Sequence, residues 1–234
     1  DMIKLVIFDF DDTITDNRHL DYASFKTTFN KFNIKNELSL KKLISLRQKS
    51  YTAKNILKVI KNSTEKKFSS KNFLNDRKNF LLSYESNNYL KVKKDTTYLM
   101  EYLDSKNISI LLCSVRHDKN IIKKFLKENN IEDYFKNIFC SSDLKLTIEN
   151  DTSSNRILIK SSLLKKILIK NKIKFYEIVY VGNSFEDKVA ALTHKINFIK
   201  FDNDYLPLEN NKYEYSANSM KDVNKILGKM LKNG

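Results

Sequence analysis

Short apolar runs of strand length, separated in the second half of the chain by helical patterns, constrain the fold of this sequence most. The runs lie at 4–8, 108–113, 138–140, 178–181 and 196–201. Between the later runs, apolar residues recur at helical spacing, as they do at Ile121, Ile122, Phe125 and Leu126. Strands that alternate with helices favour a parallel sheet covered on both faces, with the carboxyl ends of the strands at one edge. We therefore predict an α/β, Rossmann-like core.

The stretch 16–94 has a different pattern, because it shows amphipathic helical periodicity and no convincing strand. It lies between the first and second predicted strands, so we expect an all-helical domain inserted into the core domain. The predicted boundaries are 2–15 and 95–234 for the core domain and 16–94 for the insertion. Clusters of Ser and Asn at 61–72 and 149–155 are expected to be loops.

The net charge of +15 assigns no partner, because the lysines are spread through nearly every segment. The sequence has no block of about five basic residues and no nucleic-acid-binding motif, so we expect a solvated basic surface and no nucleic-acid partner. The apolar runs are far shorter than the roughly 20 residues that cross a bilayer. Nothing near the N-terminus has the order of a secretory signal. The sequence predicts a cytoplasmic protein without a membrane segment.

Three carboxylates follow the first apolar run directly. Asp9 comes at the end of the run, Asp11 lies two residues further on, and Asp12 is next to it. Clustered carboxylates repel one another and raise their own pKa values unless a cation lies between them. Magnesium takes oxygen ligands and is commonly shared between one or two carboxylates and a substrate phosphate. The sequence therefore predicts a magnesium (Mg2+) site here, with Asp12 and Asp16 as turn residues.

The pattern from Val6 to Thr13, VIFDFDDT, resembles motif I of the haloacid dehalogenase (HAD) superfamily, whose commonest members are phosphatases. Three further motifs of that superfamily can be matched in the expected order. Motif II corresponds to Ser114 at the end of ISILLCS, and motif III to Lys160, which we expect to open a helix. Motif IV corresponds to GNSFED, with Asn183 and Asp187.

This resemblance implies a HAD fold in which the inserted helices form a cap, and a magnesium-dependent phosphatase that hydrolyses a small phosphomonoester. Sugar phosphates, phosphoglycolate and nucleoside monophosphates all stay possible as substrates. Asp9 would be the nucleophile that forms an aspartyl-phosphate, and Asp11 would be the general acid and base. Ser114 and Lys160 would complete the catalytic set. The acid at Asp11 favours phosphoryl transfer over dehalogenation.

The resemblance also implies ligands for the metal and for the substrate. The metal ligands would be Asp9, the backbone carbonyl of Asp11, Asn183 and Asp187. Asn183 stands where the superfamily usually has an aspartate; its amide oxygen can still coordinate magnesium, and Asp187 could compensate through a bound water or by orienting Lys160. Contacts with the substrate are expected from Thr13, Ser114, Val115, Arg116 and, in the cap, Arg47 and Lys49.

Two other functions stay open at this point. A phosphomutase of the beta-phosphoglucomutase type would share every motif and pass the phosphoryl group to a sugar hydroxyl instead of to water. A catalytically silent protein with this fold would only bind a phosphorylated ligand, and Asn183 is the residue that favours this alternative. In each case the expected partner is a phosphorylated small molecule, and the expected state is a monomer or homodimer.

Overall fold

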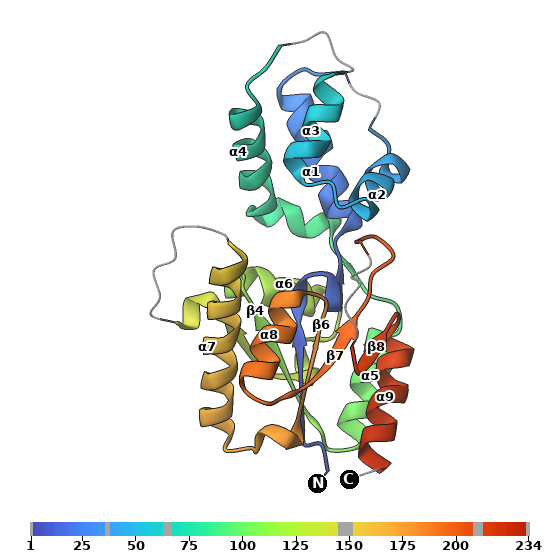
Figure 1. Cartoon of the computed structure of the whole chain (residues 1–234), viewed down its shortest axis with the longest axis vertical. Coiled ribbons are helices and arrows are strands. Elements are labelled where there is room, and N and C mark those ends of the chain that lie inside the picture. Colours follow the sequence, from blue (N-terminus) through green and yellow to red (C-terminus); the bar gives the residue numbers. More distant parts are fainter. Residues whose placement is uncertain (1, 36–37, 63–66, 145–151, 208–212, 233–234) are drawn as a thin grey trace. The chain divides into compact units, whose positions relative to one another are not determined.

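The computed structural model describes residues 2–35, 38–62, 67–144, 152–207 and 213–232, which form two compact units (Figure 1). The core unit comprises Asp1–Thr15, Val92–Asp202 and Asn211–Gly234. The helical unit comprises Asp16–Lys91 and Asn203–Asn210. The insertion predicted at 16–94 is three residues longer at its end than the first segment of the helical unit. It also does not include the second segment, which begins at Asn203.

A parallel sheet with the strand order β5-β4-β1-β6-β7-β8 forms the centre of the core unit. The strands are β1 (Leu5–Asp9), β4 (Ser109–Ser114), β5 (Phe135–Cys140), β6 (Ile178–Gly182), β7 (Asn197–Phe201) and β8 (Tyr215–Ala217). The predicted parallel α/β core is confirmed. Strand β8 adds to the five strands that the apolar runs predict.

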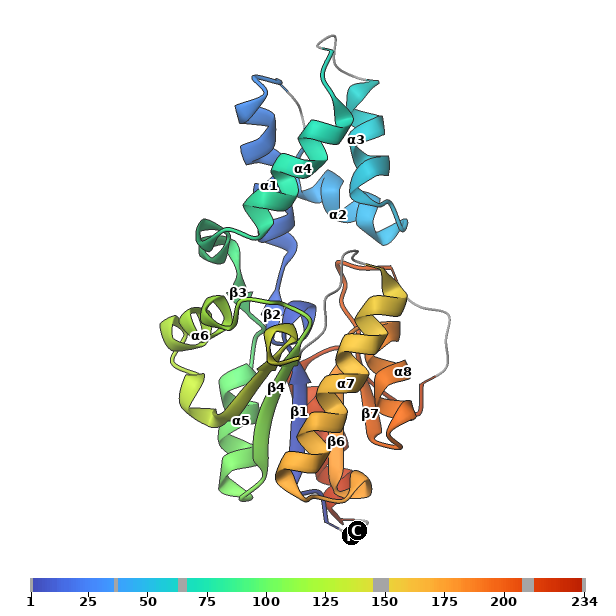
Figure 2. The same ribbon diagram turned by 90° about the vertical axis from the view of Figure 1, so that its left-hand side faces the viewer.

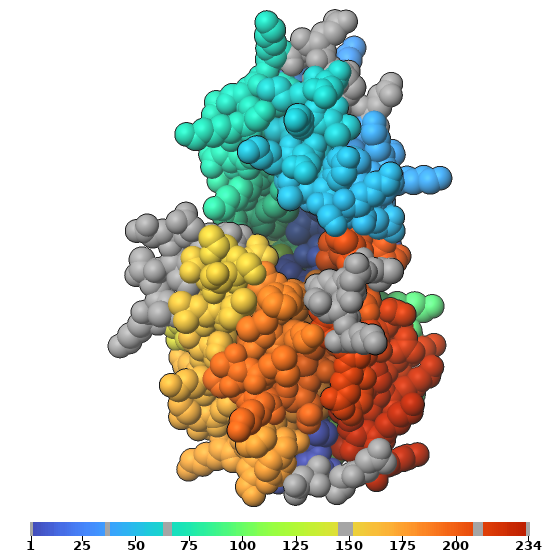
Figure 3. Space-filling view, viewed as in Figure 1, coloured from blue at the N-terminus to red at the C-terminus, as the bar shows by residue number. Residues whose placement is uncertain are grey.

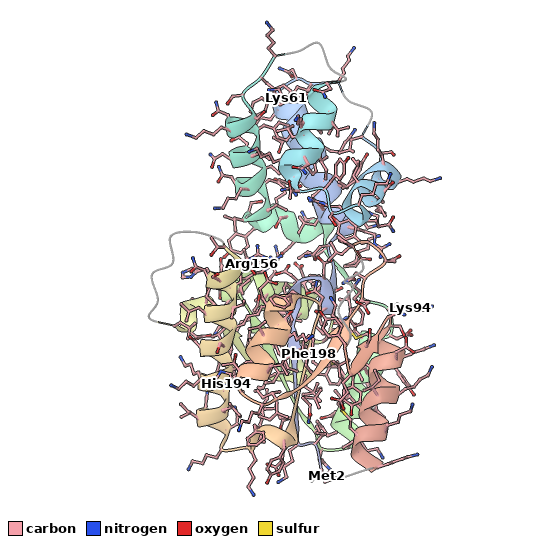
Figure 4. The ribbon with its side chains drawn as sticks, in the orientation of Figure 1. Met2, Lys61, Lys94, Arg156, His194 and Phe198 are labelled. Atoms are coloured by element: carbon pink, nitrogen blue, oxygen red, sulfur yellow. The ribbon has the colours of Figure 1, made fainter. Side chains whose placement is uncertain are left out.

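Helices cover both faces of this sheet. They are α5 (Thr96–Ser105), α6 (Lys119–Glu128), α7 (Ser153–Asn171), α8 (Phe185–Thr193) and α9 (Met220–Lys232). Figure 2, with Figure 1, shows α7 and α8 on one face and α5, α6 and α9 on the other. Helices α7 and α8 lie side by side at the surface of the core unit in Figure 3. His194, labelled in Figure 4, joins them through a 2.8 Å hydrogen bond from its Nε2 to the carbonyl oxygen of Ser161.

Strand β1 is buried on both faces, as expected for an inner strand of a parallel sheet. Side chains alternate across a strand, so Leu5 and Ile7 share one face. That face packs against α7 and α8, where Leu163 and Ala190 belong to the same buried cluster. Asp9 lies two residues beyond Ile7, and the alternation therefore directs its side chain to the face covered by α7 and α8.

The helical unit contains α1 (Arg18–Lys31), α2 (Leu40–Gln48), α3 (Ala53–Lys61), α4 (Ser70–Leu81) and a 3-10 helix at Tyr84–Tyr89. The helices pack around buried apolar side chains that include Phe25, Phe29, Leu43, Ile56 and Phe73. Without glycine or proline in this stretch, Ser and Thr side chains mark the helix starts by accepting backbone N–H groups at Ser39, Thr52 and Ser69.

The all-helical prediction for this unit is confirmed except at its ends. There, the two-residue strands β2 (Thr15–Asp16) and β3 (Lys91–Val92) pair with each other. The loop predicted at 61–72 is wrong at both ends, because Lys61 is the last residue of α3 and 70–72 form the first turn of α4. Residues 63–66 of this prediction lie outside the described residues. Throughout the ranges that the structure describes, no helix combines the length and the apolar character that a bilayer-spanning helix needs.

Candidate active site

The buried carboxylate of Asp9 is the centre of the site. Asp9 is the last residue of β1, and only 3% of its surface is exposed. It shares a face of the sheet with Ile7, which is paired in register with Tyr180 of β6. On that face α7 buries Leu163 together with Lys160. The same packing that builds the apolar core therefore brings Lys160 to Asp9.

Lys160 lies between two carboxylates. Its Nζ donates to Oδ1 of Asp9 at 2.8 Å and also to Oδ1 of Asp187, which comes from α8. All three side chains are almost completely buried. Two carboxylates thus share one ammonium group in the interior of the core unit.

The expectation that Lys160 opens a helix is wrong, because α7 already begins at Ser153. Oγ1 of Thr152 accepts the backbone N–H of Asn155 and caps the helix. The loop predicted at 149–155 is wrong for 153–155, because the small polar residues there make a first helical turn. Residues 149–151 of this prediction lie outside the described residues. The earlier start places Lys160 inside the helix, where its backbone is held by hydrogen bonds on both sides.

The charges of this buried group are not balanced. Burial raises the pKa of Asp9 to about 8, and the Asp187 carboxylate adds to this effect, while Lys160 opposes it. For Asp187, burial acts in the same direction, but Lys160 and the hydrogen bonds from Tyr180 and Ser184 outweigh it and lower the pKa. Burial also disfavours the Lys160 ammonium, yet the two carboxylates together raise its pKa. Two buried carboxylates therefore share one positive charge.

Four donors fix the Asp187 carboxylate. Besides Lys160, the hydroxyl of Tyr180 donates to Oδ1 at 2.6 Å. The backbone N–H and the hydroxyl of Ser184 donate to Oδ2 at 3.0 and 2.7 Å. Ser184 also caps α8 by accepting the N–H of Asp187 at 3.2 Å. Because both oxygens of Asp187 are used in this way, the geometry supports orientation of Lys160 by Asp187.

The turn between β6 and α8 requires glycine at its first position. A Cβ atom on Gly182 would lie 2.6 Å from Cγ of Asp187. The next residue is Asn183, whose carbonyl oxygen accepts a hydrogen bond from the buried Nζ of Lys200. Among the described residues, no three His, Cys, Asp or Glu side chains are grouped so that they could hold a metal ion. The predicted ligand set differs from such a group, since it includes the Asn183 amide and the Asp11 backbone carbonyl.

The carboxylate of Asp11 pairs with Arg116. Nε and Nη2 of Arg116 donate to the two oxygens of Asp11 at 2.9 and 2.7 Å. The guanidinium carbon of Arg116 lies 5.1 Å from the centre of the Phe10 ring, which supports the side chain from one face. The sequence predicts that Arg116 contacts substrate, and the structure places it on the residue predicted to be the general acid.

The segment after Asp9 makes a tight turn. Asp12 adopts a left-handed backbone conformation with φ of 58°, so the expectation that it is a turn residue is confirmed. Its N–H donates to Oγ1 of Thr15 at 3.2 Å, and that hydroxyl donates to the carbonyl oxygen of Phe10 at 3.1 Å. Oγ1 of Thr13 donates to Oδ2 of Asp9 at 3.4 Å. These bonds hold the turn that carries Asp11.

The end of β4 supplies the residues predicted as motif II. Ser114 is the last residue of the strand and is 1% exposed. Its Oγ accepts the N–H of Arg116 at 3.1 Å, while the carbonyl oxygen of Arg116 accepts the N–H of Ser141 at 3.1 Å. Val115 packs partly buried against the cluster under α7 and α8. The backbone of 114–116 is therefore fixed beside the pair formed by Asp11 and Arg116.

The two predicted substrate residues of the cap lie in the helical unit. Arg47 donates from Nε and Nη2 to the buried carboxylate of Asp21 at 2.7 and 2.9 Å. Lys49 follows the last residue of α2 and is exposed. The role of both residues in binding substrate stays a prediction.

Sequence reasoning did not find Tyr180, Lys200 or the buried carboxylate of Asp21. Tyr180 lies two residues before Gly182 on β6, so strand alternation places it on a definite face. Only the pairing with Ile7 shows that this face is the one that carries Asp9. That pairing depends on the order of the strands in the sheet, which a single sequence does not reveal.

Comparison with known proteins places the chain in a family. The sequence matches the family model described as haloacid dehalogenase-like hydrolase over residues 6–201. A search of curated protein sequences gives no match.

Solved structures share the fold along nearly the whole chain. A proposed phosphatase from Clostridium difficile has a TM-score of 0.71 and 18% identity, covering 97% of this chain and 99% of its own. The proposed HAD-hydrolase YfnB of Bacillus subtilis, described as bound to magnesium, has a TM-score of 0.65 and 13% identity, covering 97% and 100%. A proposed beta-phosphoglucomutase from Thermotoga maritima has a TM-score of 0.65 and 16% identity, covering 96% and 98%. At these identities the likeness shows the fold.

Proposed function

The chain belongs to the haloacid dehalogenase-like hydrolase family, and we propose that it is a magnesium-dependent phosphatase that hydrolyses a small phosphomonoester through an aspartyl-phosphate. The observation that carries this proposal is the buried pair of Asp9 and Lys160 at the carboxyl end of β1. Ligands of open α/β sheets bind at this end of the strands. The proposal goes beyond the family, because the family contains more than one activity.

In the proposed reaction, a carboxylate oxygen of Asp9 attacks the phosphorus atom and the bond from phosphorus to the leaving oxygen breaks. Lys160 and the hydroxyl of Ser114 would bind the phosphoryl oxygens and stabilise the charge that they carry. Water then attacks the aspartyl-phosphate, which releases inorganic phosphate and restores Asp9. The turn at Thr13 supports this assignment, because its hydroxyl contacts the second oxygen of Asp9 and limits rotation of the carboxylate.

Asp11 would protonate the leaving oxygen and later accept a proton from water. In the structure Arg116 holds both oxygens of Asp11, and a carboxylate held in this way cannot contact a leaving group. Arg116 would therefore release Asp11 when substrate binds, and a phosphoryl oxygen is a suitable new partner for its guanidinium group. This gives Arg116 the substrate contact that the sequence predicts.

The residues present fit a magnesium ion on one observation: two buried carboxylates, Asp9 and Asp187, share the single ammonium group of Lys160, and burial raises the pKa of Asp9 to about 8. The carboxylate of Asp9, the backbone carbonyl of Asp11 and the amide oxygen of Asn183 would hold the ion. When bound, magnesium would neutralise charge on Asp9 and on the phosphoryl group. Asp187 would act on Lys160, because its two oxygens already accept four hydrogen bonds.

The proposed partner is a phosphorylated small molecule. The cytoplasmic location and the monomeric or homodimeric state remain predictions from the sequence.

Phosphate release from a panel of phosphomonoesters, with magnesium and with EDTA, tests the proposal. Asp9→Asn should abolish release, because an amide does not form the aspartyl-phosphate. Asp12→Asn is the matched control: it makes the same chemical change three residues away, and Asn tolerates the left-handed backbone at that position. It should retain activity.

Magnesium-dependent release that Asp9→Asn loses and Asp12→Asn keeps would support the phosphatase. Equal rates in Asp9→Asn and the parent would refute the role of Asp9. A folded protein that releases no phosphate from any compound would contradict the phosphatase. Transfer to a sugar hydroxyl that needs a bisphosphate activator would then indicate a phosphomutase, and thermal stabilisation by a phosphorylated ligand without turnover would indicate a binding protein.

A further inference from the structure

A short peptide that follows β7 belongs to the helical unit although it is far from that unit in sequence. The chain enters the helical unit a second time at Asn203, after leaving it at Lys91. Of this second passage, residues 203–207 are described. Asn203 and Tyr205 are buried, at 6% and 3% exposure, so the peptide is part of the interior of the unit.

The hydroxyl of Tyr205 donates to the buried carboxylate of Asp21 on α1. The same carboxylate accepts two hydrogen bonds from Arg47 at the end of α2 and one from Arg77 on α4. Burial opposes the ionised form of Asp21, but the bonds and charges of Arg47 and Arg77 and the bond from Tyr205 lower its pKa. One carboxylate therefore joins α1, α2, α4 and the peptide.

The peptide also contacts the exposed side of the same region. Nε2 of Gln48 donates to the carbonyl oxygen of Asp204 at 2.6 Å. Nη2 of Arg18 pairs with the Asp204 carboxylate at 2.7 Å. Gln48 is the last residue of α2 and directly follows Arg47, so the peptide holds both residues that lead into the turn between α2 and α3.

In that turn Ser50 has a left-handed backbone with φ of 63°, and backbone hydrogen bonds from Ser50 to Arg47 and from Tyr51 to Leu46 close it at 2.8 and 3.1 Å. Such a conformation is unfavourable for a residue with a side chain and persists where the surroundings hold it. Nη1 of Arg47 donates to the carbonyl oxygen of Tyr51 at 2.9 Å, across the turn. The support therefore runs from Tyr205 through Asp21 and Arg47 to the turn.

We propose that Tyr205 and Asp204 are positioning residues that set the conformation of the turn 49–51 and thereby the selectivity of the enzyme among phosphomonoesters. The proposal rests on the proposed function, since this turn carries Lys49, the predicted contact for an anionic group of the substrate. Tyr205 acts through Asp21 and Arg47, and Asp204 acts through Gln48. The peptide that follows β7 thus positions the turn between α2 and α3, which lies about 150 residues earlier in the chain.

Two variants each remove one attachment. Tyr205→Phe removes only the hydroxyl and leaves Asp21 paired with two arginines, so the unit should fold. Gln48→Leu removes the hydrogen bond from Gln48 to the carbonyl oxygen of Asp204 at an exposed position. This variant still tests the proposal if Tyr205→Phe does not fold. Tyr22→Phe is the matched control, because Tyr22 is a partly buried neighbour of Asp21 in the same helix and, within the described ranges, no hydrogen bond joins its hydroxyl to the turn.

Amide hydrogen exchange of the full chain, without ligand, measures the turn directly. We expect exchange at 49–51 to accelerate at least about tenfold in Tyr205→Phe and in Gln48→Leu, and to stay at the parental rate in Tyr22→Phe. Unchanged exchange in both variants would overturn the proposal. This readout does not depend on catalysis, so it still decides the positioning role if the protein turns out not to be a phosphatase.

Steady-state kinetics with phosphoglycolate, glucose 6-phosphate and adenosine 5'-monophosphate measure the selectivity. A positioning role predicts that KM for the preferred compound rises about fivefold or more while kcat stays within about twofold, so that the three values of kcat/KM move closer together. A general loss of structure would lower kcat for all three compounds alike. Faster exchange with unchanged KM values would refute the link to selectivity.

Discussion

Replacement of Lys160 by Met tests the charge arrangement at the centre of the site. Methionine keeps an unbranched, apolar side chain in the space on α7 but removes the ammonium group. Asp187 would then be a buried carboxylate without a counter-charge, held only by the hydroxyl of Tyr180 and by Ser184. Asp9 would lose its 2.8 Å partner as well.

The cost can be estimated from the burial of the three groups. Their side chains are at most 6% exposed, so water cannot replace the lost ammonium group. Removal of one partner from a buried ion pair typically costs about 3–5 kcal/mol. We expect the free energy of unfolding of the core unit to fall by about this amount at pH 8, together with a loss of at least about a hundredfold in kcat.

The effect should depend on pH with a definite sign. In the parent, the pKa of Asp187 is lowered, chiefly by Lys160 acting against burial, so Asp187 contributes stability above its ordinary pKa of about 3.9. That contribution is lost as the pH falls through the lowered pKa. Without Lys160, burial acts alone and raises the pKa of Asp187. The difference in stability between parent and variant should therefore be largest at pH 8 and smaller near pH 4, where Asp187 of the variant has taken up a proton.

Urea unfolding in EDTA, followed by pulsed amide exchange in β1 and β4, measures the core unit separately from the helical unit. Lys165→Met is the matched control, since Lys165 lies on the same helix and is exposed; its effect should stay within about 0.5 kcal/mol. A Lys160→Met variant as stable as the control at pH 8 would refute the buried charge pair. So would a difference that grows on acidification.

Three further outcomes are expected. The pKa of Asp9 is raised to about 8, so the stability that protonated Asp9 gives below its ordinary pKa is lost as the pH rises towards 8. Asp9→Asn should remove this loss. In thermal melts in EDTA, the Tm of Asp9→Asn should therefore differ less between pH 5 and pH 9 than the Tm of the parent does. Gly182→Ala should lower the unfolding free energy by about 1–3 kcal/mol in urea melts, because its Cβ would lie 2.6 Å from Cγ of Asp187. Asn183→Asp should tighten magnesium binding about tenfold or more in titration calorimetry, because it adds a negative charge beside the ion; unchanged affinity would show that position 183 is not a ligand.

The parts of the fold that sequence predicts well are those that local patterns determine. All five predicted strands are present, because runs of β-branched and apolar residues fit strands that are buried on both faces. Asp9 and Ser114 are the last residues of their strands, so their common edge follows from the parallel arrangement alone. For the same reason, the amino-acid sequence is enough to assign the carboxylate site to the carboxyl edge of the sheet.

Helix starts are less predictable, because the same small polar residues begin helices and make loops. The residues Ser, Ser and Asn at 153–155 are typical of a loop, yet Thr152 caps a helix that starts with them. The composition of the stretch fits both structures. What decides between them is the apolar face of α7, with Ile159 and Leu163, which gains burial when the helix extends backwards to its cap.

Contacts between distant elements cannot be predicted from one sequence. The bonds from Arg116 to Asp11 and from Tyr205 to Asp21 each join residues more than a hundred positions apart. In both cases only the packing of the elements brings the partners together. Arg116 is correctly placed near the site because it follows Ser114, whereas Tyr205 has no motif near it that indicates a role in the helical unit.

Asn183 and Lys200 would both affect how strongly the predicted magnesium site attracts a cation. An amide in place of the usual aspartate removes one negative charge. The buried ammonium of Lys200 on the carbonyl oxygen of Asn183 adds a positive charge, which the Asp202 carboxylate 3.8 Å away offsets in part. Both changes weaken the attraction. Asp9 acts in the opposite direction, because it shares the single ammonium group of Lys160 with Asp187 and burial raises its pKa to about 8. Asp9 would contact the ion directly, whereas Lys200 contacts only the backbone of Asn183, so the contribution of Asp9 would be the larger one. Magnesium binding should therefore persist with Asn183 but compete with protonation of Asp9, which makes it weaken as the pH falls below 8.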